Sequence, residues 1–272
     1  PGRFASTIRR DSANGCRIAL LGLPDDTGVR LNSGRPGASD GPRAFRAALV
    51  ETGSPGNVLV LRKGANQEMY SGLGRATVST LSGFPFIARD SAGLPLLSPE
   101  VFVVVPLERA GGGGLANVVA RGVSPRAFEV RRNVRITEGR IFRSGTREVV
   151  VGASWARRFP NSAVGNTVDF GNATWTIVGH FTAGGSSFES EIWGENEQFM
   201  PVFRGEVFQS AVFRLQDPDA FAGVEETLEA DPRVSVDAYR EDRSYEGQSA
   251  NLTAVLKFVA LFLSVIMAVG AV

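Results

Sequence analysis

The chain ends in an apolar stretch, Phe258 to Val272, that contains 15 residues and no charged side chain. A transmembrane helix needs about 20 mainly apolar residues. A buried helix of a water-soluble protein normally keeps a polar face, whereas only Ser264 interrupts this stretch. We therefore expect residues 251–272 to be the start of a transmembrane helix that the sequence cuts short. A buried C-terminal helix of a soluble protein is the alternative.

The composition excludes several classes of function. With 272 residues, 43% of them hydrophobic, the chain has room for one large or two ordinary domains with a sizeable core. The net charge of +1 gives no reason to expect a nucleic-acid partner. The single cysteine, Cys16, and the single histidine, His180, exclude an internal disulfide and disfavour cysteine-based zinc sites, two-histidine metal sites and Ser-His-Asp triads.

Residues 1–50 have a pattern of their own. A short apolar run, residues 18–21, predicts a buried strand, and the Gly- and Asp-rich residues 24–40 predict a long loop. Pro42 suits the first position of a helix over residues 43–50. One strand and one helix cannot enclose a core, so we expect this part not to fold independently.

Residues 51–250 predict an α+β domain, most simply arranged as two subdomains. The expected helices are 73–81 and 153–159, and the expected strands are 58–61, 100–107, 117–121, 134–141, 148–151, 167–170 and 174–181. Residues 172–173 predict the tight turn of a hairpin. Residues 210–238 predict a strand, a helix capped by Asp217 and a second strand, which is one β-α-β unit.

No residue pattern predicts an active site, and we assign no catalytic, cofactor-binding or metal-binding residue. The glycines at 111–114 lack the Gly-Lys-Ser/Thr ending of a phosphate-binding loop, which favours a mobile hairpin tip. His180 follows an apolar run and is better explained as a strand-end side chain bonded to backbone than as a catalytic group. Asn172 and Asn251 begin glycosylation sequons, a weak signal at this length.

Two clusters of side chains leave alternatives open. The acidic residues could hold a hard cation, although their spacing is not that of an EF-hand and a solvated helix face is the default interpretation. The aromatic residues could contact a partner, although core packing is their more common position. The acidic cluster is Glu189, Glu191, Glu195 and Glu197, and the aromatic cluster is Trp193, Phe199, Phe203 and Phe208.

Residues 17–49 resemble the N-terminal segment of the arginase/agmatinase/formimidoylglutamase (ureohydrolase) family. The motifs Pro-Asp-Asp-x-Gly, Gly-Arg-x-Gly-Ala and Gly-Pro-x-x-Phe-Arg follow the strand in that order. The resemblance implies a hydrolase with a binuclear manganese centre held by His and Asp ligands further along the chain. Because the remaining sequence is different and holds one histidine, we expect no ureohydrolase activity.

The rest of the chain, from about residue 50, resembles the extracytoplasmic domain of MacB/FtsX-type ABC transporter permeases. The resemblance rests on residues 52–65, 117–130, 138–142, 148–152, 185–193 and 252–272, which occur in the expected order. In such permeases one transmembrane helix precedes this domain and a second follows it. The ureohydrolase-like piece stands where the first helix should be, so we expect a fusion or an artefactual join near residues 46–52.

The permease resemblance implies a function outside the membrane. The chain would not be an enzyme and would need no cofactor. Its expected partners are an ABC ATPase subunit, a second permease subunit in a dimer, membrane lipid and a periplasmic adaptor, with no nucleic acid. The domain would lie on the extracytoplasmic side of the cell inner membrane, where it handles a substrate. A manganese ureohydrolase fragment and a membrane-anchored binding module without transport are the competing functions.

Overall fold

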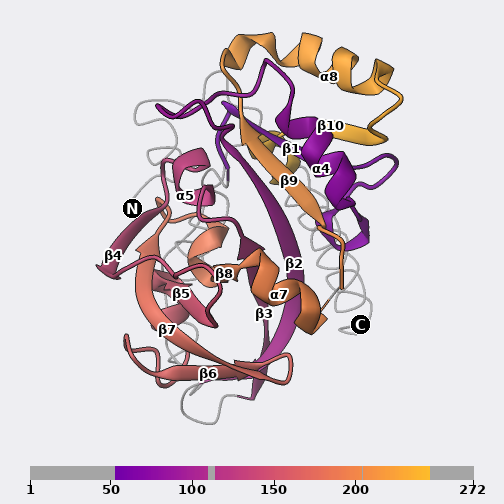
Figure 1. Cartoon of the computed structure of the whole chain (residues 1–272). Helices are drawn as coiled ribbons and strands as arrows, with labels where there is room; N and C mark the ends of the chain where they lie inside the picture. Colours follow the sequence, from indigo (N-terminus) through magenta and orange to yellow (C-terminus); the bar gives the residue numbers. More distant parts are fainter. Residues whose placement is uncertain (1–52, 110–113, 204, 246–272) are drawn as a thin grey trace, which may run out of the picture.

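The computed structural model describes residues 53–109, 114–203 and 205–245, which form a mixed α/β domain (Figure 1). The elements in chain order are β1 (Asn57–Arg62), η2 (Glu68–Tyr70), α4 (Arg75–Ser82), β2 (Leu97–Glu108), β3 (Leu115–Val123), α5 (Ala127–Val130), β4 (Arg135–Gly139), β5 (Glu148–Gly152), α6 (Ala153–Ala156), β6 (Thr167–Phe170), β7 (Ala173–Thr182), η4 (Ser187–Ser190), β8 (Ile192–Glu195), α7 (Asn196–Phe203), β9 (Ser210–Arg214), η5 (Pro218–Ala220), α8 (Phe221–Ala230) and β10 (Val236–Arg240). A helical turn over residues 241–245 follows β10.

The strands form one path in the order β10-β1-β9-β2-β3-β8-β5-β7-β4, and β6 pairs with β7. Strand β2 divides this path into two lobes. Its first residues, 97–100, pair with β9, whereas residues 101–108 pair with β3. The first lobe therefore contains β10, β1 and β9 with α4 and α8, and the second contains the remaining strands (Figure 1). This arrangement agrees with the expected mixed α/β domain of two subdomains.

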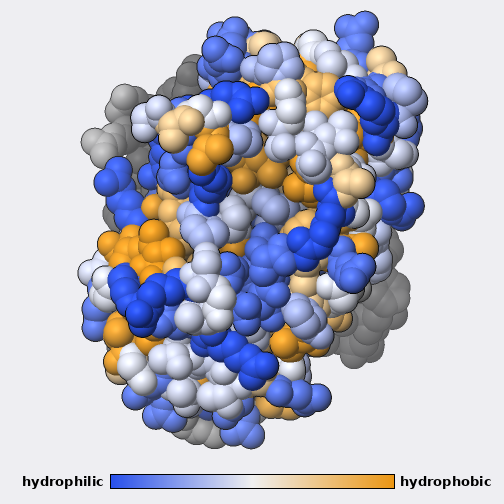
Figure 2. All heavy atoms as spheres, viewed as in Figure 1, coloured by the Kyte–Doolittle hydropathy of each residue, from blue (hydrophilic) through white to orange (hydrophobic). Residues whose placement is uncertain are grey.

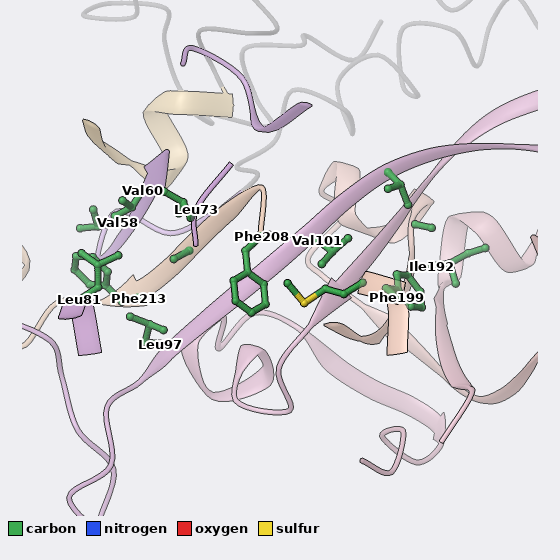
Figure 3. Packing of buried hydrophobic residues seen from close by; sticks show 14 of the residues in the cluster. Val58, Val60, Leu73, Leu81, Leu97, Val101, Ile192, Phe199, Phe208 and Phe213 are labelled. Atoms are coloured by element: carbon green, nitrogen blue, oxygen red, sulfur yellow. The ribbon is translucent and has the colours of Figure 1, made fainter. Parts of the chain in front are cut away.

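The alternating pattern of β2 explains why it can join both lobes. Val101, Val103, Val105 and Leu107 are buried, while the residues between them face outward to a greater degree, as expected of a strand with one buried face. One apolar cluster extends from the first lobe through β2 into the second (Figure 3). The two lobes thus share a continuous core. On the face of the molecule shown in Figure 2, hydrophilic residues predominate and apolar residues form separate patches.

The β-α-β unit is confirmed, with one modification. Asp217 accepts a hydrogen bond from the Asp219 N–H at the start of the helical segment, and Val224 and Leu228 of α8 are buried. Strands β9 and β10 each pair antiparallel with β1. They are therefore parallel to one another but separated by β1, which makes this a split β-α-β unit.

Two of the boundaries that differ from the sequence prediction have a local cause. The β6–β7 turn consists of Gly171 and Asn172, with φ angles of 61° and 56°, instead of Asn172 and Ala173. A two-residue turn with positive φ at both positions suits Gly and Asn and disfavours Ala, so the turn lies one residue earlier. Helix α6 ends at Ala156, before the expected end at Phe159, because Phe159 precedes a proline and the helical conformation is disfavoured there.

Several expectations lie outside the described residues. They are the strand and helix within residues 1–50, the transmembrane helix of residues 251–272, the sequon at Asn251 and the glycines at 111–113. Strands β2 and β3 on either side of those glycines do pair antiparallel, with Glu108 opposite Leu115, as in a hairpin. Within the part of the chain that the structure describes, no helix has the length and apolar character needed to span a membrane.

An ion pair at the start of β5 gives a pH-dependent prediction. The Glu148 carboxylate accepts two bonds of 2.6 Å from Arg140 and one of 3.1 Å from Arg143. The hydrogen bond from Arg140 is the main cause that lowers the pKa of Glu148 to about 2. A lowered pKa stabilises the fold above the usual value of 4.5, and this stabilisation is lost as the pH falls through the folded-state pKa.

We expect Glu148→Gln to lower the free energy of unfolding at pH 7 by about 1–2 kcal/mol, since both arginines are partly exposed and solvent screens the pair. The difference from the unmodified chain should shrink as the pH falls below 4.5. Urea unfolding monitored between pH 7 and pH 3 measures both effects. Glu226→Gln on the exposed face of α8 is the control, and an equal effect of the two variants at pH 7 would contradict the prediction.

Candidate functional site

The sequence favoured a solvated helix face for the acidic cluster. That prediction is wrong for three of the four residues. Glu189, Glu191 and Glu195 are buried. Glu189 lies in η4, Glu191 lies between η4 and β8, and Glu195 is the last residue of β8. Only Glu197, in the first turn of α7, is exposed, where it pairs with Arg75 at 2.6 Å. The four residues were expected on one helix face, but they belong to the successive elements η4, β8 and α7 and the link between the first two. Their side chains therefore point in different directions.

The buried carboxylates are each satisfied by protein donors. Glu189 accepts from the N–H groups of Ala183 and Gly185 at 2.9 and 2.8 Å, and Glu195 accepts from the Gly145 N–H at 2.6 Å. Buried carboxylates need such partners because an unpaired buried charge is costly. Among residues 53–245, where described, no group of His, Cys, Asp and Glu side chains is arranged to hold a metal ion.

The remaining sequence candidates are structural. His180 lies near the end of β7, and its ring bonds the Ser162 carbonyl oxygen at 2.6 Å and the Glu138 carboxylate at 3.1 Å, which confirms the strand-end interpretation. The aromatic residues Trp193, Phe199 and Phe208 are buried, and Phe203 packs against the core. The prediction that these aromatic residues pack in the core is therefore confirmed, and they do not form an exposed contact surface. Asn172 occupies the β6–β7 turn.

A buried ion network lies where the two lobes join, and Arg121 of β3 is its first centre. Its guanidinium is 1% exposed and donates to three carboxylates. The shortest bonds are 2.7 Å to Glu68, 2.9 Å to Glu100 and 2.9 Å to Glu191. Because Glu68 belongs to η2, Glu100 to β2 and Glu191 precedes β8, a single side chain connects three separate segments.

Arg131, directly after α5, is the second centre of the network and is fully buried. It donates to both carboxylate oxygens of Glu100, with one bond of 3.1 Å, and to Glu241 at 2.6 Å. Glu241 also accepts bonds from the Asn57 side chain at 2.9 Å and the Ser54 N–H at 3.1 Å. Residues at both ends of the described domain, 54 and 241, thus take part in the same group of bonds.

Aromatic rings cover the two guanidinium groups. Arg121 lies over Phe102 and Phe188, with centroid distances of 5.1 and 5.5 Å, and Arg131 lies over Phe188 and Trp193, at 4.8 and 5.5 Å. Rings at these distances attract cations, and more strongly where water is excluded. They also exclude the solvent that would otherwise screen the ion pairs.

Burial and the neighbouring charges shift the pKa values of Glu191 and Glu68 in opposite directions. Burial raises the pKa of Glu191, and Arg121 offsets this only in part. Burial would also raise the pKa of Glu68, but the charge and hydrogen bonds of Arg121, with the Ser210 hydroxyl and the charge of Arg131, together outweigh it and the pKa is lowered. Burial and the nearby Glu68 raise the pKa of Tyr245, whose hydroxyl lies 3.3 Å from that carboxylate. Glu191 is therefore the network carboxylate that protonates before Glu68.

This arrangement positions segments and has no evident catalytic chemistry. The guanidinium and carboxylate groups of the network are occupied by one another, which leaves no nucleophile or general base among them directed at a cleft. The helical turn that holds Glu241 and Tyr245 comes shortly before the residues of the apolar C-terminal stretch. A displacement of that turn would break buried ion pairs and hydrogen bonds to the segment after α5 and to η2.

The sequence analysis missed most of this network, including Arg121, Arg131, Glu68, Glu100 and Glu241. A usable signal was present, because Arg121 and Glu100 lie within strongly apolar strands. Charged residues are almost never fully buried without a partner, so opposite charges in two neighbouring buried strands predict an ion pair. Arg131, Glu68 and Glu241 lie outside regular strands and carry no comparable signal.

Comparisons with known proteins agree with this fold. A family model described as the MacB-like periplasmic core domain matches residues 42–231. The structure is similar to that of the periplasmic region of MacB from Actinobacillus actinomycetemcomitans, with a TM-score of 0.51 and 15% identity over 73% of this chain and 92% of that one. It is also similar to the extracellular domain of the noncanonic ABC-type transporter YknZ from Gram-positive bacteria, with a TM-score of 0.51 and 10% identity over 67% and 99% of the two chains. At these identities the likeness shows the fold.

A second match is short. A stretch of 38 residues, 14% of this chain, is 55% identical to formimidoylglutamase from Salmonella typhi and covers 12% of that protein. Formimidoylglutamase from Salmonella newport matches over the same length with 53% identity. The chain thus spans about an eighth of the length of the curated relatives that it matches. Both resemblances seen in the sequence are confirmed. The resemblance to the ureohydrolase family is confirmed only for this short fragment.

Proposed function

The chain belongs to the family of MacB-like periplasmic core domains, which are parts of ABC-type transporter permeases, and we propose that its domain couples the ATP-driven motion of a partner ATPase to the transport or extraction of a substrate outside the membrane. The observation that carries this proposal is the contact of Glu241 with Arg131, Asn57 and Ser54. Through this carboxylate, the segment leading to the apolar C-terminal stretch is bonded to the centre of the domain.

The physical basis for coupling is the cost of separating buried charges. Removing one partner of a buried ion pair typically costs about 3–5 kcal/mol. A movement of the 241–245 turn is therefore cheaper if Arg131 and Glu100 move with it than if the ion pairs break. Since Glu100 lies in β2, which both lobes share, such a movement would reach both lobes.

The proposal also assigns the segments of the chain and names its partners. Residues 1–50 would be a ureohydrolase-like fragment, residues 51–250 the extracytoplasmic core domain, and residues 251–272 the start of a transmembrane helix. The partners would be an ABC ATPase subunit, a second permease subunit, membrane lipid and a periplasmic adaptor. The start of the family match at residue 42 and the brevity of the formimidoylglutamase match support a division near residue 50.

The test is the ATPase activity of the native complex. The tagged chain is purified in detergent from the cells that produce it, together with any subunit that carries a phosphate-binding loop. We expect an ATP-hydrolysing complex, and we expect Glu241→Gln to change its ATPase rate several-fold without dissociating it. Glu226→Gln on the surface of α8 is the matched control. A Glu241→Gln complex with an unchanged ATPase rate would contradict the coupling role of the network.

The same purification separates the competing functions. A chain that binds no ATPase subunit would be a membrane-anchored binding module. Release of urea or formamide in the presence of manganese would indicate a ureohydrolase. The second result is not expected, because the similarity to formimidoylglutamase is confined to 38 residues.

A further inference from the structure

A cavity of about 1070 Å³ opens between the two lobes. The first lobe contributes residues 53–57, the segment after α4 and the end of β9. The second contributes Val130 at the end of α5, Arg132 and Asn133 shortly after it, and residues 183–184 after β7. A cavity of this size is at the upper end of the range for small-molecule sites, and such sites favour the interfaces between domains. Its position therefore makes it a candidate ligand site outside the ion network.

The charged side chains that line the cavity are all positive. The lining contains Arg89, Arg132 and Arg214, and none of its described members is acidic. Arg89 donates to the Gly93 carbonyl oxygen at 2.9 Å, and Arg214 donates to the Glu129 carbonyl oxygen at 3.0 Å. No carboxylate pairs with these three arginines within the described part of the chain. Each guanidinium has five N–H donors, so most of their donors remain available to a ligand.

Electrostatics support the same interpretation. Burial is the main cause that lowers the pKa of Arg214, and the positive charge of Arg132 lowers it further. The negative charge of Glu129 raises this pKa and offsets part of the shift. Two arginines that repel one another beside a cavity are stabilised by an anion between them. Other arginines of the domain, such as Arg126 and Arg140, have carboxylate partners at 2.8 and 2.6 Å, whereas this group has none among the described residues.

We propose that the cavity between the lobes binds the phosphate group of a phosphomonoester or phosphodiester through Arg89, Arg132 and Arg214. The planar fork of a guanidinium matches the oxygens of a phosphate. A phosphate offers more acceptor oxygens than a carboxylate, which suits three arginines from three segments. Apolar side chains in the same lining, including Val130 and Leu215, could hold the organic part of the ligand.

The site also borders the ion network. Ser54 and Asn57 line the cavity and bind Glu241, and Arg132 is adjacent in sequence to the buried Arg131. A ligand that draws residues of both lobes together would therefore act on the same segments as a movement of the 241–245 turn. This binding does not require an ATPase subunit, so it is tested separately from the proposed function.

The test is isothermal titration calorimetry of the full chain in neutral detergent at low salt, with three probes: inorganic phosphate, glycerol phosphate and dihexanoyl phosphatidylglycerol below its micelle concentration. We expect saturable binding that weakens about tenfold or more in Arg132→Gln and in Arg214→Gln, because each loses charge-assisted hydrogen bonds. Arg135→Gln, on the exposed surface of β4, is the matched control for the loss of one positive charge.

The outcomes are distinct. Tighter binding of the short-chain lipid than of glycerol phosphate assigns the site to a phospholipid headgroup, and equal binding assigns it to a soluble phosphate compound. Absence of binding by all three probes would overturn the proposal. An equal loss in Arg135→Gln would also overturn it, since the attraction would then be a general surface effect. Circular dichroism of each variant verifies that it is folded.

Discussion

The variant Arg131→Met is expected to lower the free energy of unfolding by about 3–5 kcal/mol, the typical cost of removing one partner of a buried ion pair. Arg131 is fully buried, and its guanidinium binds the carboxylates of Glu100 and Glu241. Methionine fills a similar volume but offers no donor, so both carboxylates lose a partner in a site closed to water. Urea unfolding of the full chain in detergent measures the loss.

A compensating variant separates the loss of charge balance from the loss of packing. In Arg131→Met/Glu241→Gln the Glu241 carboxylate, which lost its arginine partner, is replaced by a neutral amide that can still bond the Asn57 side chain. We expect the double variant to be more stable than Arg131→Met alone, because a buried charge without a partner is the larger cost. A double variant that is less stable than the single variant would show that packing around Arg131, and not its charge, determines the effect.

The ion network also connects the two lobes through buried side chains. Arg121 and Arg131 share Glu100, so the two centres are connected through one residue of β2. The carboxylates come from η2, β2, the residue before β8 and the 241–245 turn. Segments far apart in the sequence are thereby held at one point, while the cavity with its three arginines lies beside it, between the lobes.

Local patterns in the sequence predicted most strands and helices of the described region. The alternation of β2 and the Asp217 cap depend only on neighbouring residues, which is why they could be identified. The placement of β1 between β9 and β10 could not, because pairing between distant strands leaves no local signal.

The candidate site, too, could be predicted only where neighbouring residues determine it. The sequence drew attention to Glu191 and Trp193 through their spacing, but indicated a solvated face for the acidic residue. Burial of Glu191 depends on Arg121, 70 residues away. The partner of a buried charge is set by tertiary structure, so the network became visible only in three dimensions.

The second large effect is expected at Trp193, which belongs to a second apolar cluster of the domain together with Phe181 and Phe188. It is fully buried and lies 4.9 Å from Phe181 and 5.5 Å from Phe188 between ring centroids. Its indole N–H also donates to Glu191 at 2.7 Å. We expect Trp193→Ala to lower the free energy of unfolding by about 3–5 kcal/mol, since it creates a large cavity and removes a donor from a buried carboxylate.

The packing and hydrogen-bond contributions can be separated with a second tryptophan. Trp155 is 1% exposed and stacks on Phe159, but its indole nitrogen has no hydrogen-bond partner in the described structure. The change Trp155→Phe therefore removes ring volume and an N–H without a partner among the described residues, whereas Trp193→Phe removes ring volume and the bond to Glu191. We expect Trp193→Phe to be the more destabilising by about 1.5–3 kcal/mol, the usual contribution of a hydrogen bond to a charged group. Equal losses in urea unfolding would mean that the bond to Glu191 adds nothing to the stability of the network, and that Trp193 acts only through its packing.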